Sequence, residues 1–381
     1  MYRIGKEEAD AAARVIMSGS LFRIGSKYQE VNHFEEEMKT KIGVKHCLCL
    51  TSGTAALQTG LAALGVGPGD EVIIPAYTFI STAVAVLAVG AIPVIADIDE
   101  TLTLDPADVE RKISKYTKVV IPVHIAGFPC DMDRFLALSK QYGFRIVEDA
   151  CQADGGSYKG KRFGSMGDTG AFSFNWFKII SAGEGGAFVT NDLKLFERAI
   201  IYHDCGTPFW TYEQPIELPI FSGFNMRSNE ITGAILREQL KRLDGILGDL
   251  RRVKRAIMDG LGGKVRFSPS NDIDGDCGTT LPFNFDTIEE AVAFEKKIGG
   301  LRPINTDKHV YCNWTPVIEK RGAHINAYDP FLNPQNAGLN MNYTPDMCKA
   351  SLDILSRTVY YAMNPDWTDE DIGRKIELFS K

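Results

Sequence analysis

The sequence has none of the features of a membrane-spanning or exported protein. No run approaches the ~20 consecutive apolar residues that cross a bilayer, and Asp10 and Arg14 interrupt the apolar N-terminal segment, which makes it a poor signal peptide. The eight cysteines are scattered without the paired C-x-x-C spacing of a zinc site, and they do not form a disulfide framework in a chain of 381 residues. We therefore expect a cytoplasmic protein without a bound metal or a membrane contact.

An excess of positive charge is absent as well. The chain has 42 Lys and Arg against 49 Asp and Glu, and the resulting net charge of -7 repels polyphosphate backbones. Nucleic acid is therefore not an expected partner. Cys47 and Cys49 fall on one face of an expected strand, where two buried small apolar side chains are a better interpretation than a metal site.

The sequence does contain a regular alternation of short apolar runs and helical segments between residues 46 and 192. Several runs are nearly continuous in Val, Ile and Ala, which is typical of strands covered on both faces. The alternation predicts a three-layer α/β/α fold around a mostly parallel sheet, in which ligands bind beyond the carboxyl ends of the strands. The expected strands span residues 46–50, 71–75, 92–98, 119–124, 145–147, 170–174 and 186–190.

A long helix is predicted at residues 231–261, where Leu and Ile recur at steps of three, four or seven. Beyond this helix the expected strands are shorter, at 280–285 and 309–314, and we place a domain boundary near residue 240. The division gives an N-terminal helix and arm (1–30), a large ligand-binding domain (31–240) and a smaller C-terminal α/β domain (241–381).

The first candidate site segment is Ser52-Gly53-Thr54, where a strand turns into a helix. A helix start presents unpaired N–H groups and the positive end of the helix dipole, which suits a phosphate group. An ordinary N-cap by Ser52 or Thr54 explains the same residues, and the segment alone favours the cap.

The second segment is the acidic pair Glu148-Asp149 at the end of an apolar strand. Two carboxylates are costly to bury there unless a cationic group receives one of them. Strand alternation places the two side chains on opposite sides, with Asp149 the one that points into the site. Taken alone, the segment fits a capping or surface aspartate equally well.

The third segment holds Lys178, which lies among Trp176, Phe177 and two isoleucines. Desolvation in general leaves more of a lysine amine neutral and therefore nucleophilic. A surface lysine whose stem covers apolar neighbours is the alternative. The following run, Gly183-Glu184-Gly185-Gly186, indicates a backbone that passes close to another part of the molecule.

The fourth segment contains Asn225 and Arg227, just before the long helix. They alternate with apolar neighbours, so both side chains can point the same way, although a local structural role is the default for the segment alone.

Together the segments are more specific than any one of them. A phosphate cradle, an aspartate about a hundred residues later and a lysine after a further ~30 residues meet the three needs of pyridoxal phosphate. The cradle anchors the phosphate, the aspartate keeps the pyridine nitrogen protonated, and the lysine forms the Schiff base. The pattern therefore predicts a pyridoxal-phosphate enzyme.

The sequence resembles the DegT/StrS family of sugar aminotransferases, which have the aspartate-aminotransferase fold (fold type I). The resemblance extends from Phe34 to the Trp367-Thr368 segment. The matching motifs are Ser52-Gly53-Thr54-Ala55-Ala56-Leu57, Pro75-Ala76-Tyr77-Thr78-Phe79, Glu148-Asp149-Ala150-Cys151-Gln152, Phe172-Ser173-Phe174 with Lys178, Gly183-Glu184-Gly185-Gly186 and Gly223-Phe224-Asn225-Met226-Arg227.

The resemblance implies a role for each cofactor-binding residue. Lys178 looks like the Schiff-base lysine, Asp149 like the partner of the pyridine nitrogen, and Gln152 like the contact of the phenolic oxygen. Phe79 is expected to stack on the cofactor ring. The residues expected to hold the phosphate are Gly53, Thr54 and Ser173.

The resemblance also implies a homodimer with shared active sites. Asn225 is similar to a residue that reaches the phosphate from the neighbouring subunit, and Arg227 is a candidate for the carboxylate of the amino donor. One departure lies three residues before the lysine, where the family often has histidine or another aromatic residue and this chain has Asn175.

The expected reaction moves an amino group from L-glutamate to a keto or aldehyde sugar. The acceptor is expected to be a nucleotide-linked ketosugar or an octulosonate-type sugar acid, and a cyclitol ketone remains an alternative. A branch of the family removes oxygen from sugars and has histidine in place of the lysine, so Lys178 argues against that branch. A dehydratase on the same scaffold is the second hypothesis. A non-catalytic pyridoxal-phosphate regulator is the third, disfavoured because no helix-turn-helix or basic segment accompanies the fold.

Overall fold

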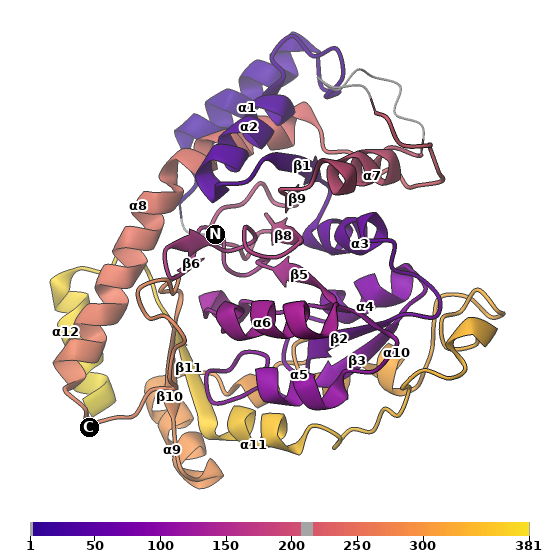
Figure 1. Cartoon of the computed structure of the whole chain (residues 1–381). Helices are drawn as coiled ribbons and strands as arrows, with labels where there is room; N and C mark the ends of the chain where they lie inside the picture. Colours follow the sequence, from indigo (N-terminus) through magenta and orange to yellow (C-terminus); the bar gives the residue numbers. More distant parts are fainter. Residues whose placement is uncertain (1–2, 207–215, 381) are drawn as a thin grey trace.

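A seven-stranded sheet lies at the centre of the molecule (Figure 1). The computed structural model describes residues 3–206 and 216–380. Within these residues the strand order is β1-β9-β8-β5-β4-β2-β3. The strands are β1 (His46–Leu50), β2 (Glu71–Pro75), β3 (Ile92–Ala96), β4 (Thr117–Val120), β5 (Arg145–Asp149), β8 (Thr169–Ser173) and β9 (Gly186–Thr190).

The strand directions bring several loops to one edge of the sheet. β5 runs parallel to β8 and β4, and β2 runs parallel to β4 and β3. β9 is antiparallel to both of its neighbours, β1 and β8, so β1 has the same direction as β8. The carboxyl ends of β1, β2, β5 and β8 therefore lie on the same side, where a ligand site of such a sheet is found. The mostly parallel sheet predicted from the sequence is confirmed.

Helices cover both faces of this sheet, and successive strand residues alternate between two cores. Cys47 and Cys49 belong to one buried cluster and Leu48 and Leu50 to the other. This alternation is what a strand between two helix layers requires. The helices are α1 (Lys6–Ser18), α2 (Glu30–Ile42), α3 (Gly53–Ala63), α4 (Ser81–Ala88), α5 (Pro106–Lys112), α6 (Met132–Tyr142), α7 (Leu193–His203), α8 (Glu230–Leu261), α9 (Ile288–Ile298), α10 (Thr315–Ile318), α11 (Lys349–Arg357) and α12 (Asp369–Ser380).

The long helix α8 joins the sheet to the C-terminal part of the chain. It packs on α1 and α2 at one end and on α12 at the other, and it buries the Leu and Ile residues that predicted it. It passes residue 240 without a break, so the domain boundary placed there stays a prediction. In residues 3–206 and 216–380, no helix has the length and apolar character needed to cross a membrane.

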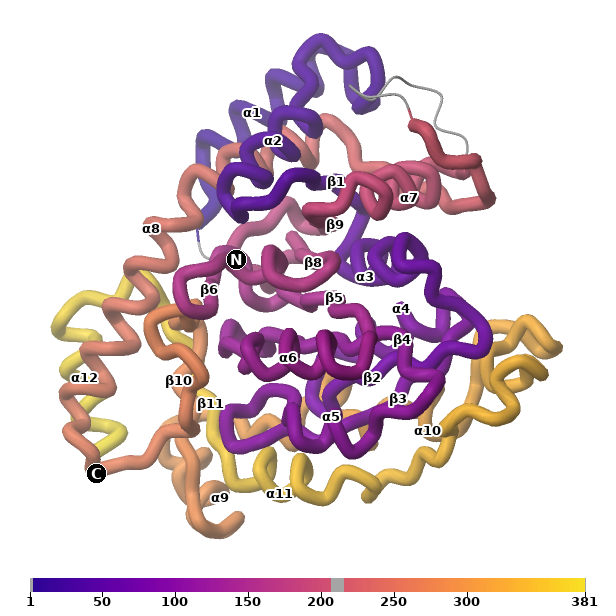
Figure 2. The backbone as a smooth tube through the Cα atoms, in the orientation of Figure 1, coloured from indigo at the N-terminus to yellow at the C-terminus, as the bar shows by residue number. Residues whose placement is uncertain are grey.

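The C-terminal segments lie in the lower part of the view in Figure 2, in orange and yellow. They include the antiparallel pair β10 (Thr280–Asn284) and β11 (Thr358–Ala362). A separate short pair is β6 (Ser157–Tyr158) and β7 (Lys161–Arg162). The strand predicted at 309–314 is wrong. The chain there forms a 3-10 turn, Tyr311–Asn313, and residues 308, 309 and 311 form backbone hydrogen bonds with the segment after β2 instead of with a strand of a sheet.

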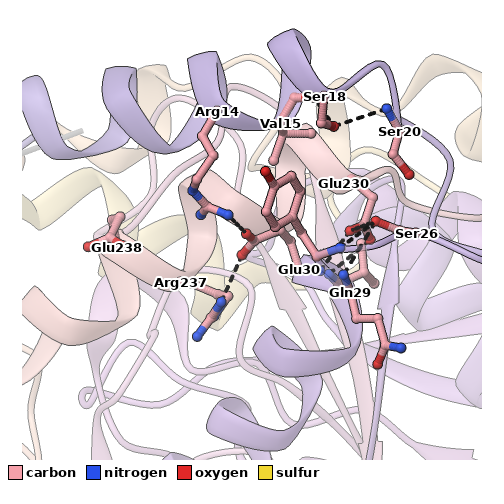
Figure 3. Close-up of polar contacts among 12 residues, drawn as sticks. Arg14, Val15, Ser18, Ser20, Ser26, Gln29, Glu30, Glu230, Arg237 and Glu238 are labelled. Atoms are coloured by element: carbon pink, nitrogen blue, oxygen red, sulfur yellow. Dashed lines mark hydrogen bonds and ion pairs between the residues drawn. The ribbon is translucent and has the colours of Figure 1, made fainter.

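A buried carboxylate fixes the start of α8 against the N-terminal helices (Figure 3). Glu230, the first residue of α8, accepts hydrogen bonds from the Ser26 hydroxyl (2.7 Å) and from the backbone N–H groups of Glu30 (2.7 Å) and Val31 (3.2 Å). These N–H groups open α2 and have no partner inside that helix. Glu230 therefore caps α2 from another helix and fixes the chain just after Asn225 and Arg227.

Candidate active site

The turn from β1 into α3 forms a narrow cradle beside the end of β8. Ser52 is the N-cap of α3, and its hydroxyl accepts the Ala55 N–H at 3.1 Å. A Cβ on Gly53 would lie 2.7 Å from Ser173 Cβ and 2.8 Å from Cys151 Sγ. Only glycine fits so close an approach. The cap predicted for Ser52 is confirmed, and Gly53 and Ser173 lie against each other as a shared phosphate site would require.

Asp149 ends β5 with a buried carboxylate that faces polar groups. One oxygen accepts the Thr82 hydroxyl at 2.9 Å and the other accepts the Cys151 N–H at 3.1 Å. Thr82 Oγ1 in turn lies 2.8 Å from Thr78 Oγ1. Asp149 is therefore neither a surface residue nor a helix cap. It is held at the carboxyl edge of the sheet with its charge only partly compensated by neutral donors.

Glu148 points to the opposite side, as strand alternation predicted, but its partners differ from the expectation. It accepts backbone N–H groups of Gly164 (3.0 Å), Met166 (2.6 Å) and Gly167 (2.6 Å), and it lies 3.2 Å from His124 Nε2. A loop of amide groups, not a lysine or arginine, thus compensates this carboxylate. Its role is to fix the loop after β7.

Lys178 lies on a loop that follows β8. Backbone hydrogen bonds within the loop hold it together. The N–H of Phe174 donates to the Gly185 carbonyl, that of Trp176 to Gly183, and that of Lys178 to Asn175. A Cβ on Gly186 would come within 2.2 Å of the Ser52 carbonyl oxygen, so the predicted close approach of this glycine run is confirmed. The loop is pressed directly onto the cradle.

The surroundings of Lys178 are less apolar in the single chain than the sequence suggested. Ile179 and Ile180 are buried, but Trp176 is 54% exposed and Phe177 is 81% exposed. The lysine charge still reaches the interior of the site. Burial raises the pKa of the Asp154 carboxyl well above its usual range, and the charge of Lys178 opposes that rise.

Gln152 and Phe79 meet through a histidine that the sequence did not single out. Gln152 Oε1 accepts the Ala126 N–H at 3.1 Å, and Gln152 Nε2 lies 3.3 Å from His309 Nε2. The His309 ring is 5.3 Å from the Phe79 ring, between centroids. Burial, followed by the charge of Lys178, lowers the pKa of His309 to about 4. The charge of Lys178 therefore helps to lower the pKa of His309, the histidine that contacts both Gln152 and Phe79.

Asn225 and Arg227 lie beside the end of β1, at the rim of the site. The Thr51 N–H donates to the carbonyl of Met226, which lies between them, at 3.1 Å. Asn225 is exposed, and Arg227 forms an ion pair with the buried Asp204. The Arg227 guanidinium also lies over the Phe22 ring, 5.6 Å from its centroid.

Sequence reasoning missed three residues of this region: Thr82, Asp154 and His309. Thr82 lay in an unremarkable apolar segment and carried no pattern, and Asp154 lay in a loop. His309 belonged to a predicted strand, and only the fold brings it more than 150 residues back to Gln152. A signal was available for Asp154 alone, since a carboxylate five residues after Asp149 follows the same motif.

A model of the DegT/DnrJ/EryC1/StrS aminotransferase family matches residues 2–274 of the chain. The chain belongs to this family. Membership confirms the resemblance noted from the motifs, together with the predicted enzyme class and the predicted cofactor, because these aminotransferases depend on pyridoxal phosphate.

Similar proteins agree with this assignment. The 3-amino-5-hydroxybenzoate synthase of Amycolatopsis mediterranei is 40% identical over 240 residues, 62% of this chain and 61% of the relative. The GDP-perosamine synthase of Caulobacter vibrioides is 41% identical over 232 residues, 60% of this chain and 61% of the relative. The match thus spans about three fifths of each relative's length. A solved structure of 3-amino-5-hydroxybenzoic acid synthase has a TM-score of 0.81 at 29% identity, with 100% of this chain and 97% of that chain covered, which confirms the predicted fold.

The residues present in this aminotransferase-family chain fit pyridoxal phosphate. The cradle leaves no room for a Cβ at Gly53 and adjoins a serine hydroxyl and a helix start, which suits a phosphate. The buried carboxylate of Asp149 suits a protonated ring nitrogen. A primary amine, Lys178, and an amide, Gln152, complete the donor set.

Proposed function

We propose that this protein transfers an amino group from L-glutamate to a keto or aldehyde sugar, in the biosynthesis of an amino sugar. The proposed acceptor is a nucleotide-linked ketosugar or an octulosonate-type sugar acid. The observation that supports the proposal most is the geometry of the carboxyl edge, where the buried Asp149, the Gly53–Ser173 cradle and the Lys178 loop come together. The name of the perosamine relative supports a sugar acceptor.

In the proposed site the cofactor contributes an electron-withdrawing ring that stabilises negative charge at the substrate Cα. Asp149 holds the proton on the ring nitrogen, and the hydroxyl of Thr82 keeps the carboxylate oriented. The phosphate is held by Gly53, Thr54 and Ser173. Gln152 donates to the phenolic oxygen, and Phe79 packs on the ring face.

Lys178 is proposed to act twice. Its amine would hold the cofactor covalently until glutamate displaces it, and Nζ would then move the proton that leaves the substrate Cα. The same amine delivers a proton to the sugar carbon that receives the nitrogen. Because Lys178 can return this proton, the reaction ends as amino transfer without loss of a hydroxyl.

Arg227 is proposed to receive the carboxylate of the amino donor, since a guanidinium pairs with a carboxylate through two parallel N–H groups. Its ion pair with Asp204 orients the guanidinium from behind.

We also propose a cytoplasmic homodimer in which Asn225 reaches the phosphate of the neighbouring subunit. The support is the exposure of Asn225 in one chain, together with large exposed aromatic side chains in both site segments: Phe177 at 81%, Trp176 at 54% and Phe224 at 54%. Exposed aromatic residues of this size are enriched at subunit interfaces.

The test is a pair of half-reactions followed by absorbance. L-glutamate added to the cofactor-loaded protein should bleach the visible band and release 2-oxoglutarate, and an acceptor should restore the band and gain an amine. The acceptors compared are a nucleotide-linked ketosugar, an octulosonate-type keto acid and a cyclitol ketone. A product that loses oxygen without gaining nitrogen would replace this proposal with the dehydratase.

A further inference from the structure

His309 is carried into the site by a segment from the C-terminal half of the chain. The Thr78 N–H donates to the His309 carbonyl at 2.9 Å, and the Ile80 N–H donates to the Lys308 carbonyl at 2.8 Å. These two backbone hydrogen bonds lie immediately before α4, the helix whose Thr82 hydroxyl donates to Asp149. The position of the His309 ring is therefore fixed by backbone bonds to the site itself.

The hydrogen bonds of Gln152 determine which end of its amide donates and which end accepts. Gln152 Oε1 accepts the Ala126 N–H at 3.1 Å, so the other end of the amide is the donor. The Gln152 Nε2 group has two hydrogens, and one of them faces His309 Nε2 at 3.3 Å. His309 Nε2 must then be an acceptor, which places the ring proton on Nδ1.

We propose that His309 is a positioning residue that anchors one N–H of the Gln152 amide and thereby aims the second N–H at the phenolic oxygen of the cofactor. The inference rests on the proposed function, which gives Gln152 that contact. With Ala126 on one end and His309 on the other, the amide cannot rotate without losing a hydrogen bond. Its free N–H is thus pre-oriented before the cofactor arrives.

The protonation state of His309 agrees with this role. A protonated ring would present an N–H to the amide N–H₂ and break the contact. Burial and the charge of Lys178 together lower the pKa of His309 to about 4, so the ring is neutral at neutral pH. Three side chains near the ring are uncharged at that pH: the amide of Gln152, the Phe79 ring, and Tyr77, whose ring centroid is 6.3 Å away.

The first test needs no cofactor. Selective ¹⁵N-histidine NMR of the apo protein at pH 7 should show the His309 ring protonated at Nδ1 and unprotonated at Nε2, with the signal assigned by its absence in His309→Gln. In Gln152→Ala this signal should move. A ring protonated at Nε2 in the wild-type protein would overturn the proposal.

The second test distinguishes the effect of the hydrogen-bond acceptor of His309 from the effect of its aromatic ring. His309→Phe keeps an aromatic ring but removes the acceptor, and we expect its dissociation constant for pyridoxal phosphate to rise roughly three- to tenfold, the loss of one hydrogen bond. His309→Gln keeps a side-chain acceptor near the position of Nε2 and should bind the cofactor nearly as the wild type does. The matched control is His324→Phe, on an exposed ring away from this contact.

The mechanism is tested in the Gln152→Ala background. If His309 acts through Gln152, His309→Phe should cause no further loss there, whereas a general structural role would cause the same loss in both backgrounds. Thermal unfolding of each apo variant shows whether it is folded. Equal binding by His309→Phe and wild type would overturn this inference alone, while a wild-type protein that does not bind pyridoxal phosphate would overturn the proposed function as well.

Discussion

Glu148 and Asp149 are neighbours in the sequence with opposite surroundings, and the proposed role of Asp149 depends on this contrast. Three backbone N–H groups compensate Glu148, whereas Asp149 has one hydroxyl and one N–H. The less compensated carboxylate is the one suited to a cationic ligand group. This difference was invisible in the sequence, because the loop that surrounds Glu148 is assembled only by the fold.

Replacement of Asp149 should therefore impair turnover more than folding. Asp149→Asn keeps the size and the Thr82 contact but removes the charge, and a loss of ~3 kcal/mol of barrier lowering would slow turnover about a hundredfold. The measurement is the rate of the glutamate half-reaction, with circular dichroism to confirm the fold. Asp286→Asn, on an exposed ion pair, is the matched control. Unchanged turnover in Asp149→Asn would show that the charge of Asp149 does not have the role proposed for it.

One buried histidine, His203, and one half-buried histidine, His309, predict how stability depends on pH. Burial, followed by the charge of Arg23, lowers the pKa of His203 to about 3, and the pKa of His309 is lowered to about 4. The unfolded chain takes up these protons near pH 6.5, and the folded chain resists them. Stability is therefore present above pH 6.5 and falls as the pH drops toward 4, by about 1.4 kcal/mol per pH unit for each histidine.

Urea unfolding of the apo protein at pH 7, 6, 5 and 4.5 checks this dependence. His309→Phe and His203→Gln should each flatten the slope between pH 6.5 and 4.5. A slope that is the same in both variants as in the wild type would show that neither histidine is the group that titrates.

At the scale of the element, Glu230 links two helices that are 200 residues apart in sequence. Its carboxylate accepts three donors at the start of α2 and is fully buried. Glu230→Ala should lower the free energy of unfolding by about 3 kcal/mol, because it leaves buried donors without an acceptor. Glu238→Ala, on a surface ion pair of the same helix, should cost less than about 1 kcal/mol. Equal effects in urea unfolding would contradict the capping role.

Most elements could be predicted because their patterns are local. The leucine spacing of α8 and the apolar runs of the sheet are properties of short windows, and each matches an element of the structure. The strand predicted at 309–314 failed for a tertiary reason. Its backbone donors and acceptors pair with residues 76–80 rather than with a neighbouring strand, and no local pattern reveals such a partner.

At the scale of the whole molecule, the candidate site was predictable only as separate motifs. Each of Gly53, Asp149 and Lys178 has a strand end beside it, and the common direction of β1, β5 and β8 brings them together. His309 was not predictable, since its place depends on the path of the chain after α8. The exposed fractions of Trp176 and Phe177 likewise differ from the apolar setting expected.

The proposed shared site predicts complementation between two impaired variants. Lys178→Ala lacks the lysine, and Asn225→Ala lacks the phosphate contact given to the neighbour. In a mixed dimer one site would hold both defects and the other neither. Equal mixing after reversible dissociation should therefore restore about a quarter of the wild-type activity, since half of the dimers are mixed. Activity that stays at the average of the two parent variants would contradict a shared site.

The central claim is that Lys178 carries pyridoxal phosphate, and borohydride reduction tests it most directly. The holoprotein is reduced, digested and mapped by mass spectrometry. The account predicts a pyridoxyl group on the peptide that contains Lys178 and no pyridoxyl group in Lys178→Ala. A pyridoxyl group on Lys159, Lys161 or Lys194 in the wild-type protein would contradict it.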